Sequence, residues 1–133
     1  MISPESLLFR GVERRLEAEG KRPLSVIRDM IGSQATKAIV ARSRFFPDQK
    51  ETGVWTDAGG SAIIETYPAF VKHRSPRFAE PFPEPIDSEH EDIQDAYICA
   101  LVAYSFAVDR QVLEQQFEAA DPAEGWIWAP RKA

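Results

Sequence analysis

The chain has 133 residues and a mass of 15.0 kDa, the size of one domain, so two full catalytic domains are excluded. Hydrophobic residues make up 44% and charged residues 28%, which excludes a disordered chain and indicates a buried core. The single cysteine excludes an intrachain disulfide. The longest apolar run, residues 96–108, is too short and too interrupted to span a bilayer, and no signal peptide is visible. We therefore expect a cytoplasmic protein with no membrane partner.

The net charge of -5 is unevenly distributed along the chain. Residues 1–50 carry ten Lys or Arg against six Asp or Glu, and residues 51–133 carry six against fifteen. A basic surface that approaches phosphates, beside an acidic cluster that binds a metal ion, would produce this asymmetry. A mixed, solvated surface would produce the same counts.

The first part of the sequence predicts helices. Ser3, Pro4 and Glu5 are typical of a helix start, and the spacing of apolar residues predicts a helix to Glu19 that ends at Gly20. Residues 25–45 predict a short helix followed by a longer one, which Ser33 caps and Pro47 ends.

Two short strands follow. Residues 53–56 and 61–66 are β-prone and flank a turn-rich spacer. The second run is continuously apolar over residues 62–64, which predicts a strand covered on both faces. The next segment, residues 74–91, has four prolines within ten residues and is expected to be an exposed loop.

Residues 88–108 predict the longest helix. Ser88 and Glu91 have the spacing of a capping box, and apolar residues on every side of the later turns indicate burial all round. Asp109 is expected to cap a further helix that ends near residue 120, and residues 124–130 form a short β-prone tail with Trp126 and Trp128 as packing anchors.

Three carboxylates form the candidate metal site. Asp92 and Asp95 lie three residues apart, so both side chains project from one side of the helix. Glu65 comes at the carboxyl end of the predicted buried strand, where it could converge on the same cation. Such a cluster points to Mg²⁺- or Mn²⁺-assisted phosphoryl transfer. The alternative is structural, because acids in the first turns of a helix are favoured by the helix dipole alone.

The sequence gives little support for catalysis by histidine, cysteine or serine or for nucleotide binding. His73 and His90 are interpreted as surface groups, and Cys99 as a buried small hydrophobe rather than a nucleophile. The sequence contains no P-loop, no dinucleotide-binding fingerprint and no serine in a glycine-flanked turn.

Several segments together resemble the predicted ribonuclease H-like nucleases of domain-of-unknown-function family 429. The order is a strand with Glu, an aromatic residue and Pro, then Asp-x-x-Asp-Ala on an Ala-rich helix, then Glu-Gly-Trp-Ile and Pro. The matching segments are Phe9-Arg10 with Glu13-Arg14, residues 29–37, Gly53-Val54-Trp55, residues 64–69, residues 92–96 with Cys99-Ala100-Leu101, and residues 124–127 with Pro130. The Asp-x-x-Asp-Ala helix also resembles the last acidic helix of Holliday-junction resolvases.

The resemblance implies a fold class, a set of metal ligands and a missing amino-terminal part. It implies an α/β, ribonuclease H-like domain over residues 1–133, helix-rich and incomplete, with two to three short strands. It implies that Asp92 and Asp95 are metal ligands and that Glu65 is a weaker candidate. Members of the family begin with a strand that bears a Gly-x-Asp aspartate, which is missing here. The chain is therefore expected to correspond to the carboxyl-terminal half of the domain, as a truncated product or as half of a split protein.

Two functional hypotheses follow. The first is a metal-dependent nuclease, inactive alone and completed by a separate amino-terminal piece. The second is a non-catalytic remnant or interaction module that forms a homodimer, because few strands are available to cover the sheet edges. Nucleic acid is implied as a partner by the resemblance only. A local basic face could be supplied by Arg10, Arg14, Arg15, Lys21, Arg22, Arg28, Lys37, Arg42 and Arg44.

Overall fold

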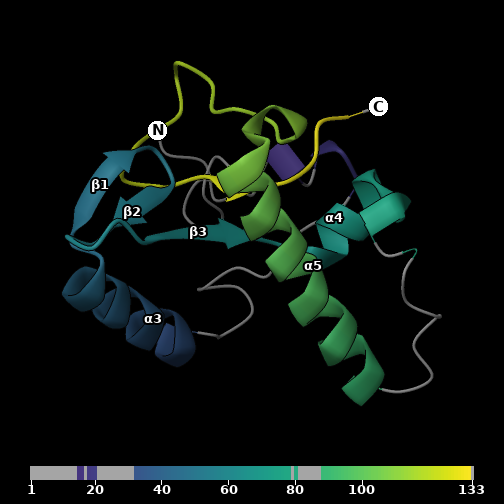
Figure 1. Cartoon of the computed structure of the whole chain (residues 1–133), viewed down its shortest axis with the longest axis horizontal. Helices are drawn as coiled ribbons and strands as arrows, with labels where there is room; N and C mark the ends of the chain where they lie inside the picture. The colour runs from purple at the N-terminus through teal and green to yellow at the C-terminus, as the bar shows by residue number, and fades with distance from the viewer. Residues whose placement is uncertain (1–14, 17, 21–31, 79, 81–87, 133) are drawn as a thin grey trace, which may run out of the picture. The chain divides into compact units, whose positions relative to one another are not determined.

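A computed structural model describes residues 15–16, 18–20, 32–78, 80 and 88–132 (Figure 1). The expected first helix therefore lies largely outside the described residues. The chain divides into two compact units, one formed by Met1–Glu65 with Gln116–Ile127 and the other by Thr66–Gln115 with Trp128–Ala133. In the part of the chain that is described, no helix is long and apolar enough to cross a membrane.

Within the described residues, the strands form one mixed sheet of four strands in the order β1-β2-β3-β4. The strands are β1 (Asp48–Glu51), β2 (Val54–Thr56), β3 (Ala62–Thr66) and β4 (Ile127–Trp128). The α/β class is confirmed, and the expected two to three strands are corrected to four. Strand β1 escapes a pattern-based prediction because its sequence, Asp-Gln-Lys-Glu, contains no apolar residue.

In the first unit, α3 (Gly32–Phe45) confirms the predicted second helix and its end before Pro47. The turn between β2 and β3 is held by Asp57, whose Oδ1 accepts hydrogen bonds from the backbone N–H groups of Gly59 and Ser61 at 2.9 and 2.8 Å. This local Asx turn explains why the spacer was recognisable from sequence.

The core of the first unit forms around Trp126, which is 2% exposed. Gly53 has φ +78°, and its backbone lies so close to Trp126 that a Cβ at this position would be 2.4 Å from Trp126 Cβ. Arg15 lies over the indole ring of Trp126, with its Cζ 4.4 Å from the ring centroid. Leu16 and Val54 are also buried. The packing role predicted for Trp126 is therefore confirmed.

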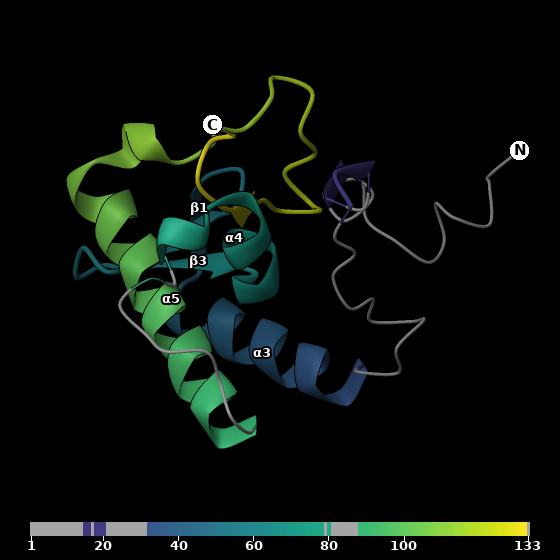
Figure 2. The same cartoon turned by 90° about the vertical axis from the view of Figure 1, so that its right-hand side faces the viewer.

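The second unit contains α4 (Pro68–Arg74), the 3₁₀ turn η1 (Pro76–Phe78) and α5 (Ser88–Val108). Helices α4 and α5 lie side by side (Figures 1 and 2). The buried residues of this core come from both helices, from the segment after α5 and from the tail: Phe70, Val71, Ile98, Val102, Leu113, Trp128 and Ala129.

The bounds of α5 match the prediction, but its burial does not. Gln94, Ile98 and Val102 recur every fourth residue and form one buried stripe, whereas the opposite face is exposed. The prediction of burial all round is therefore wrong. Much of the apparent hydrophobicity comes from alanines, which bury little area and are tolerated at a surface.

Two further predictions are corrected in the same way. Strand β3 is not covered on both faces, because Ala62 is exposed and Ile63 is 39% exposed. Its β-branched residues favour a strand whether or not they are buried. Of the expected loop 74–91, Arg74 ends α4, residues 76–78 form η1 and residues 88–91 belong to α5, so the loop is shorter than expected.

The helix expected after Asp109 is absent from the described residues 109–120, where only the short 3₁₀ turn η2 (Arg110–Val112) forms. Asp109 makes no side-chain cap hydrogen bond there. The following backbone pairs with the tail instead, since Leu113 forms an antiparallel bridge with Pro130 and Glu114 N–H donates to Ala129 O at 2.9 Å. Tertiary pairing thus overrides the helical periodicity of this segment.

Candidate metal site on α5

Asp92 and Asp95 lie in the first two turns of α5, on the same side of the helix. Asp92 is exposed, and the side chain of Asp95 is 36% exposed. Both carboxylates therefore reach solvent, and their predicted placement on one side of a helix is confirmed.

Lys72 binds one of these carboxylates. Its ammonium nitrogen lies 2.8 Å from Asp95 Oδ1 and 3.2 Å from Gln94 Oε1, and Lys72 belongs to the last turn of α4. Gln94 is 5% exposed, so its amide oxygen is satisfied by a charged donor rather than by bulk water. The result is a polar cluster of Lys72, Gln94 and Asp95 where α4 packs against α5.

Cys99 lies one turn after Asp95 and is exposed, which corrects its interpretation as a buried residue. Partial burial of the thiol group raises its pKa, and the negative charge of Asp95 raises it further. Both causes disfavour the thiolate, which is the nucleophilic form. The prediction that Cys99 is not a nucleophile is thus consistent with its surroundings.

Glu65 lies in β3 and is half-buried. It belongs to the first unit, whereas Asp92 and Asp95 belong to the second. Within the described residues no group of three or more His, Cys, Asp or Glu side chains is placed to hold a metal ion. The convergence of Glu65 with the two aspartates stays a prediction. His73 and His90 are both exposed, as expected.

Lys72 and Gln94 were not singled out from the sequence. Lys72 lies in the basic last turn of α4, and Gln94 sits between the two aspartates. A glutamine on the stripe of Ile98 and Val102 is a signal, because a polar residue on a buried face needs a partner. Nothing in the sequence pairs it with a lysine 22 residues earlier.

Comparisons with protein-family models, with curated proteins and with solved structures find no match for this chain.

Proposed function

We propose that the chain is the carboxyl-terminal half of a ribonuclease H-like, metal-dependent nuclease domain, inactive alone, in which Asp92 and Asp95 bind Mg²⁺ or Mn²⁺. The observation that carries the proposal is the placement of Asp95. This residue is partly exposed and lies one turn after the exposed Asp92, and its Oδ1 is 2.8 Å from Lys72 Nζ, which fixes its orientation. Phosphodiester hydrolysis and a nucleic-acid substrate come from the sequence resemblance. Glu65 is proposed as a third, weaker ligand.

The two aspartates fit the requirements of Mg²⁺. This ion keeps several waters and is commonly bound through one or two carboxylates. Lys72 contacts Oδ1 of Asp95, so the second carboxylate oxygen can face a hydrated cation beside Asp92. When bound, the cation would supply Lewis-acid stabilisation of a phosphoryl oxygen. Lys72 would orient Asp95 and lower the affinity for the cation by adding positive charge.

Titration with Mn²⁺, followed by the loss of the free-ion electron paramagnetic resonance signal, tests the site. We expect binding that the double variant Asp92→Asn/Asp95→Asn reduces at least tenfold. Lys72→Met should tighten binding, because it removes a competing cation and its charge. The matched control Asp109→Asn/Glu118→Gln removes two exposed acids elsewhere and should leave the affinity unchanged. Equal losses in the two double variants would mean diffuse binding to surface acids and would reject the site.

Self-association is a second candidate function, favoured by a separate observation. Large apolar side chains are exposed on two helices: Ile39, Val40 and Phe45 on α3, and Ile93, Tyr104 and Val108 on α5, each between 54% and 65% exposed. Exposed apolar area on this scale is typical of interaction surfaces. A non-catalytic, oligomerising module would account for it, and light scattering at micromolar concentration should then give at least twice the mass of 15.0 kDa.

A further inference from the structure

The side of α5 opposite its buried stripe is an exposed apolar face, which we call the α5 outer face. Its members are all exposed and follow at intervals of three and four: Ile93, Ala96, Ala100, Ala103, Tyr104 and Ala107. Ile93 is 54% exposed and Tyr104 is 64% exposed. Large side chains left in solvent on one uncharged helix face are typical of a surface that binds another protein.

The order of large and small residues on the outer face fits a second copy of the same face. When two α5 helices lie antiparallel and centred on Ala100, residues equally far before and after Ala100 are at the same level. Ile93 of one copy then faces Ala107 of the other, and Tyr104 faces Ala96. Each large side chain meets a small one, and the alanines let the two helix axes approach to about 8 Å.

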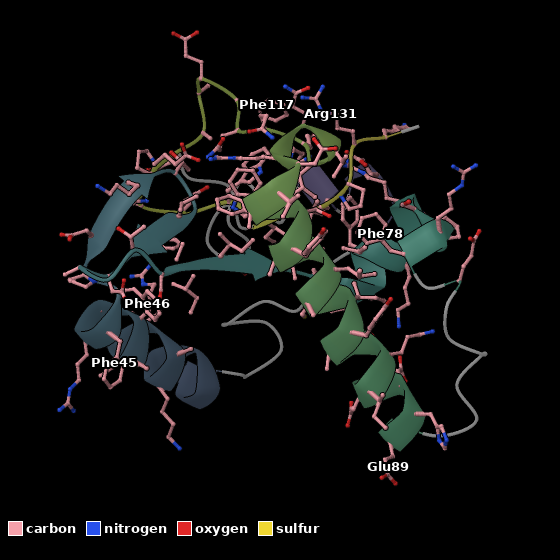
Figure 3. The ribbon with its side chains drawn as sticks, viewed as in Figure 1. Phe45, Phe46, Phe78, Glu89, Phe117 and Arg131 are labelled. Carbon is pink, nitrogen blue, oxygen red and sulfur yellow. The ribbon has the colours of Figure 1, made fainter. Side chains whose placement is uncertain are left out.

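The two ends of α5 differ in charge, which favours the antiparallel direction. Exposed carboxylates lie in the first turns: Glu89, Glu91 and Asp92. At the other end, Arg110 follows the helix, and Arg131 lies beside the same segment, because its Nε donates to Leu113 O at 3.2 Å. Asp109 adds one negative charge there, against these two arginines. Figure 3 shows Glu89 and Arg131 at opposite ends of α5.

The direction of packing therefore decides which charges meet. A parallel pair of α5 helices would bring the acidic first turns of the two copies together, which is unfavourable. In the antiparallel pair, the acids of one copy approach the arginine end of the other. The two Glu89 residues then lie about 30 Å apart, beyond the range of screened repulsion.

We propose that the chain forms a two-fold homodimer in which the α5 outer faces of two copies pack antiparallel, centred on Ala100. The inference rests on the self-association proposed above and names its contact. Both copies use the same patch, as an isologous interface requires. The contact needs only α5, which lies within one compact unit of the chain.

The length of the outer face sets the strength of this dimer. From Ile93 to Ala107 the face extends over about 20 Å. One pair of helices over this length buries less than the roughly 1,200 Å² of a standard interface. We therefore expect a dimer that exchanges with the monomer and whose population rises with concentration over the micromolar range.

Single cysteines distinguish the antiparallel contact from a parallel one. In a Cys99→Ala background, Ala100→Cys should give a reducible dimer on mild oxidation, because this residue meets its own copy. Ile93→Cys and Ala107→Cys should each stay monomeric alone and should cross-link when the two proteins are mixed. Ala41→Cys, at an exposed alanine of α3, is the matched control and should stay monomeric. A cross-link of Ile93→Cys with itself would show parallel packing and would overturn the proposal.

Charges placed on the two-fold axis test the same contact without oxidation. Ala100→Glu and Ala100→Lys should each raise the dissociation constant of the dimer at least tenfold in analytical ultracentrifugation, because like charges meet at the centre. An equimolar mixture of the two variants should form a heterodimer, because the charges are then opposite. The control Ala41→Glu introduces the same charge at an exposed helical alanine and should leave the dissociation constant unchanged.

The remaining outcomes separate this contact from self-association in general. A dimer that Ala100→Glu and Ala100→Lys leave unchanged would reject the α5–α5 contact and keep self-association. Two variants that are monomeric alone and stay monomeric when mixed would show that Ala100 does not meet its own copy, and would also reject the contact. An unmodified protein that is monomeric throughout the micromolar range would reject both proposals.

Discussion

Lys72 Nζ lies 2.8 Å from Asp95 Oδ1, and this ion pair joins α4 to the first turns of α5. The same ammonium group donates to the buried amide of Gln94 at 3.2 Å. One side chain therefore satisfies a buried acceptor and fixes the orientation of a carboxylate. The pair has a structural role whether or not Asp95 binds a cation.

Lys72→Met should destabilise the protein by about 1 kcal/mol, because Gln94 Oε1 loses its donor while the aliphatic packing is kept. The partly exposed ion pair with Asp95 contributes only a small share of this loss. Urea unfolding checks the prediction through the midpoint. Lys50→Met, at an exposed position in β1, is the control and should shift the midpoint little. A Lys72→Met protein as stable as the control would show that Gln94 needs no charged donor.

Gly53→Ala should cost about 3 kcal/mol of unfolding free energy, from the left-handed backbone together with overpacking. The added methyl group would lie 2.4 Å from Trp126 Cβ, at φ +78°. Gly60→Ala is a matched control, since Gly60 has φ +86° but nothing within 4 Å of an added Cβ. It should cost only about 1 kcal/mol. Equal midpoints in thermal unfolding would contradict the close approach of Gly53 to Trp126.

Cys99 should react slowly with iodoacetamide at neutral pH. Burial of the thiol and the charge of Asp95 raise its pKa, so the thiolate fraction at a given pH is smaller than in an unfolded peptide. Alkylation should speed up as the pH rises through this elevated pKa. Asp95→Asn should lower the pKa and increase the rate at neutral pH, by a smaller factor than unfolding does, because burial is the larger cause. A rate in Asp95→Asn equal to that of the unmodified protein would contradict the electrostatic contribution.

The elements with strong local signals were predictable from the sequence. Pro47 follows apolar residues at helical intervals and predicted the end of α3. The capping pair Ser88 and Glu91 predicted the start of α5. Asp57 and the glycines after it marked the turn between β2 and β3. In each case the information lies within a few residues of the boundary, where capping and turn chemistry act.

What depends on distant residues was not predictable. Strand β1 pairs through its backbone with β2, although its side chains are polar. The apolar spacing after Asp109 predicted a helix, but Leu113 pairs instead with Pro130, 17 residues away in sequence. The same limit applies to the candidate site, where the spacing of Asp92 and Asp95 was visible but the contact with Lys72 was not. A periodic pattern defines faces, and tertiary contacts decide which face is covered.

The purified chain should hydrolyse neither DNA nor RNA at a measurable rate with Mg²⁺ or Mn²⁺. Two-metal hydrolysis needs carboxylates that fix both ions, and α5 offers two, one of which is already bound by Lys72. Release of fluorescence from quenched DNA and RNA oligonucleotides measures the rate. Robust cleavage that Asp95→Ala abolishes would show that the carboxylates of this chain suffice.

Paramagnetic broadening by Mn²⁺ tests most directly whether Asp92, Asp95 and Glu65 share one cation. In amide NMR spectra, the signals of all three residues should broaden together at the lowest Mn²⁺ concentrations, and Asp95→Asn should remove the effect at all three. Broadening of Asp92 and Asp95 without Glu65 would remove Glu65 from the site. Broadening that is strongest at acids outside α5, such as Glu118 or Asp121, and that is unchanged in Asp95→Asn, would contradict a metal site on α5.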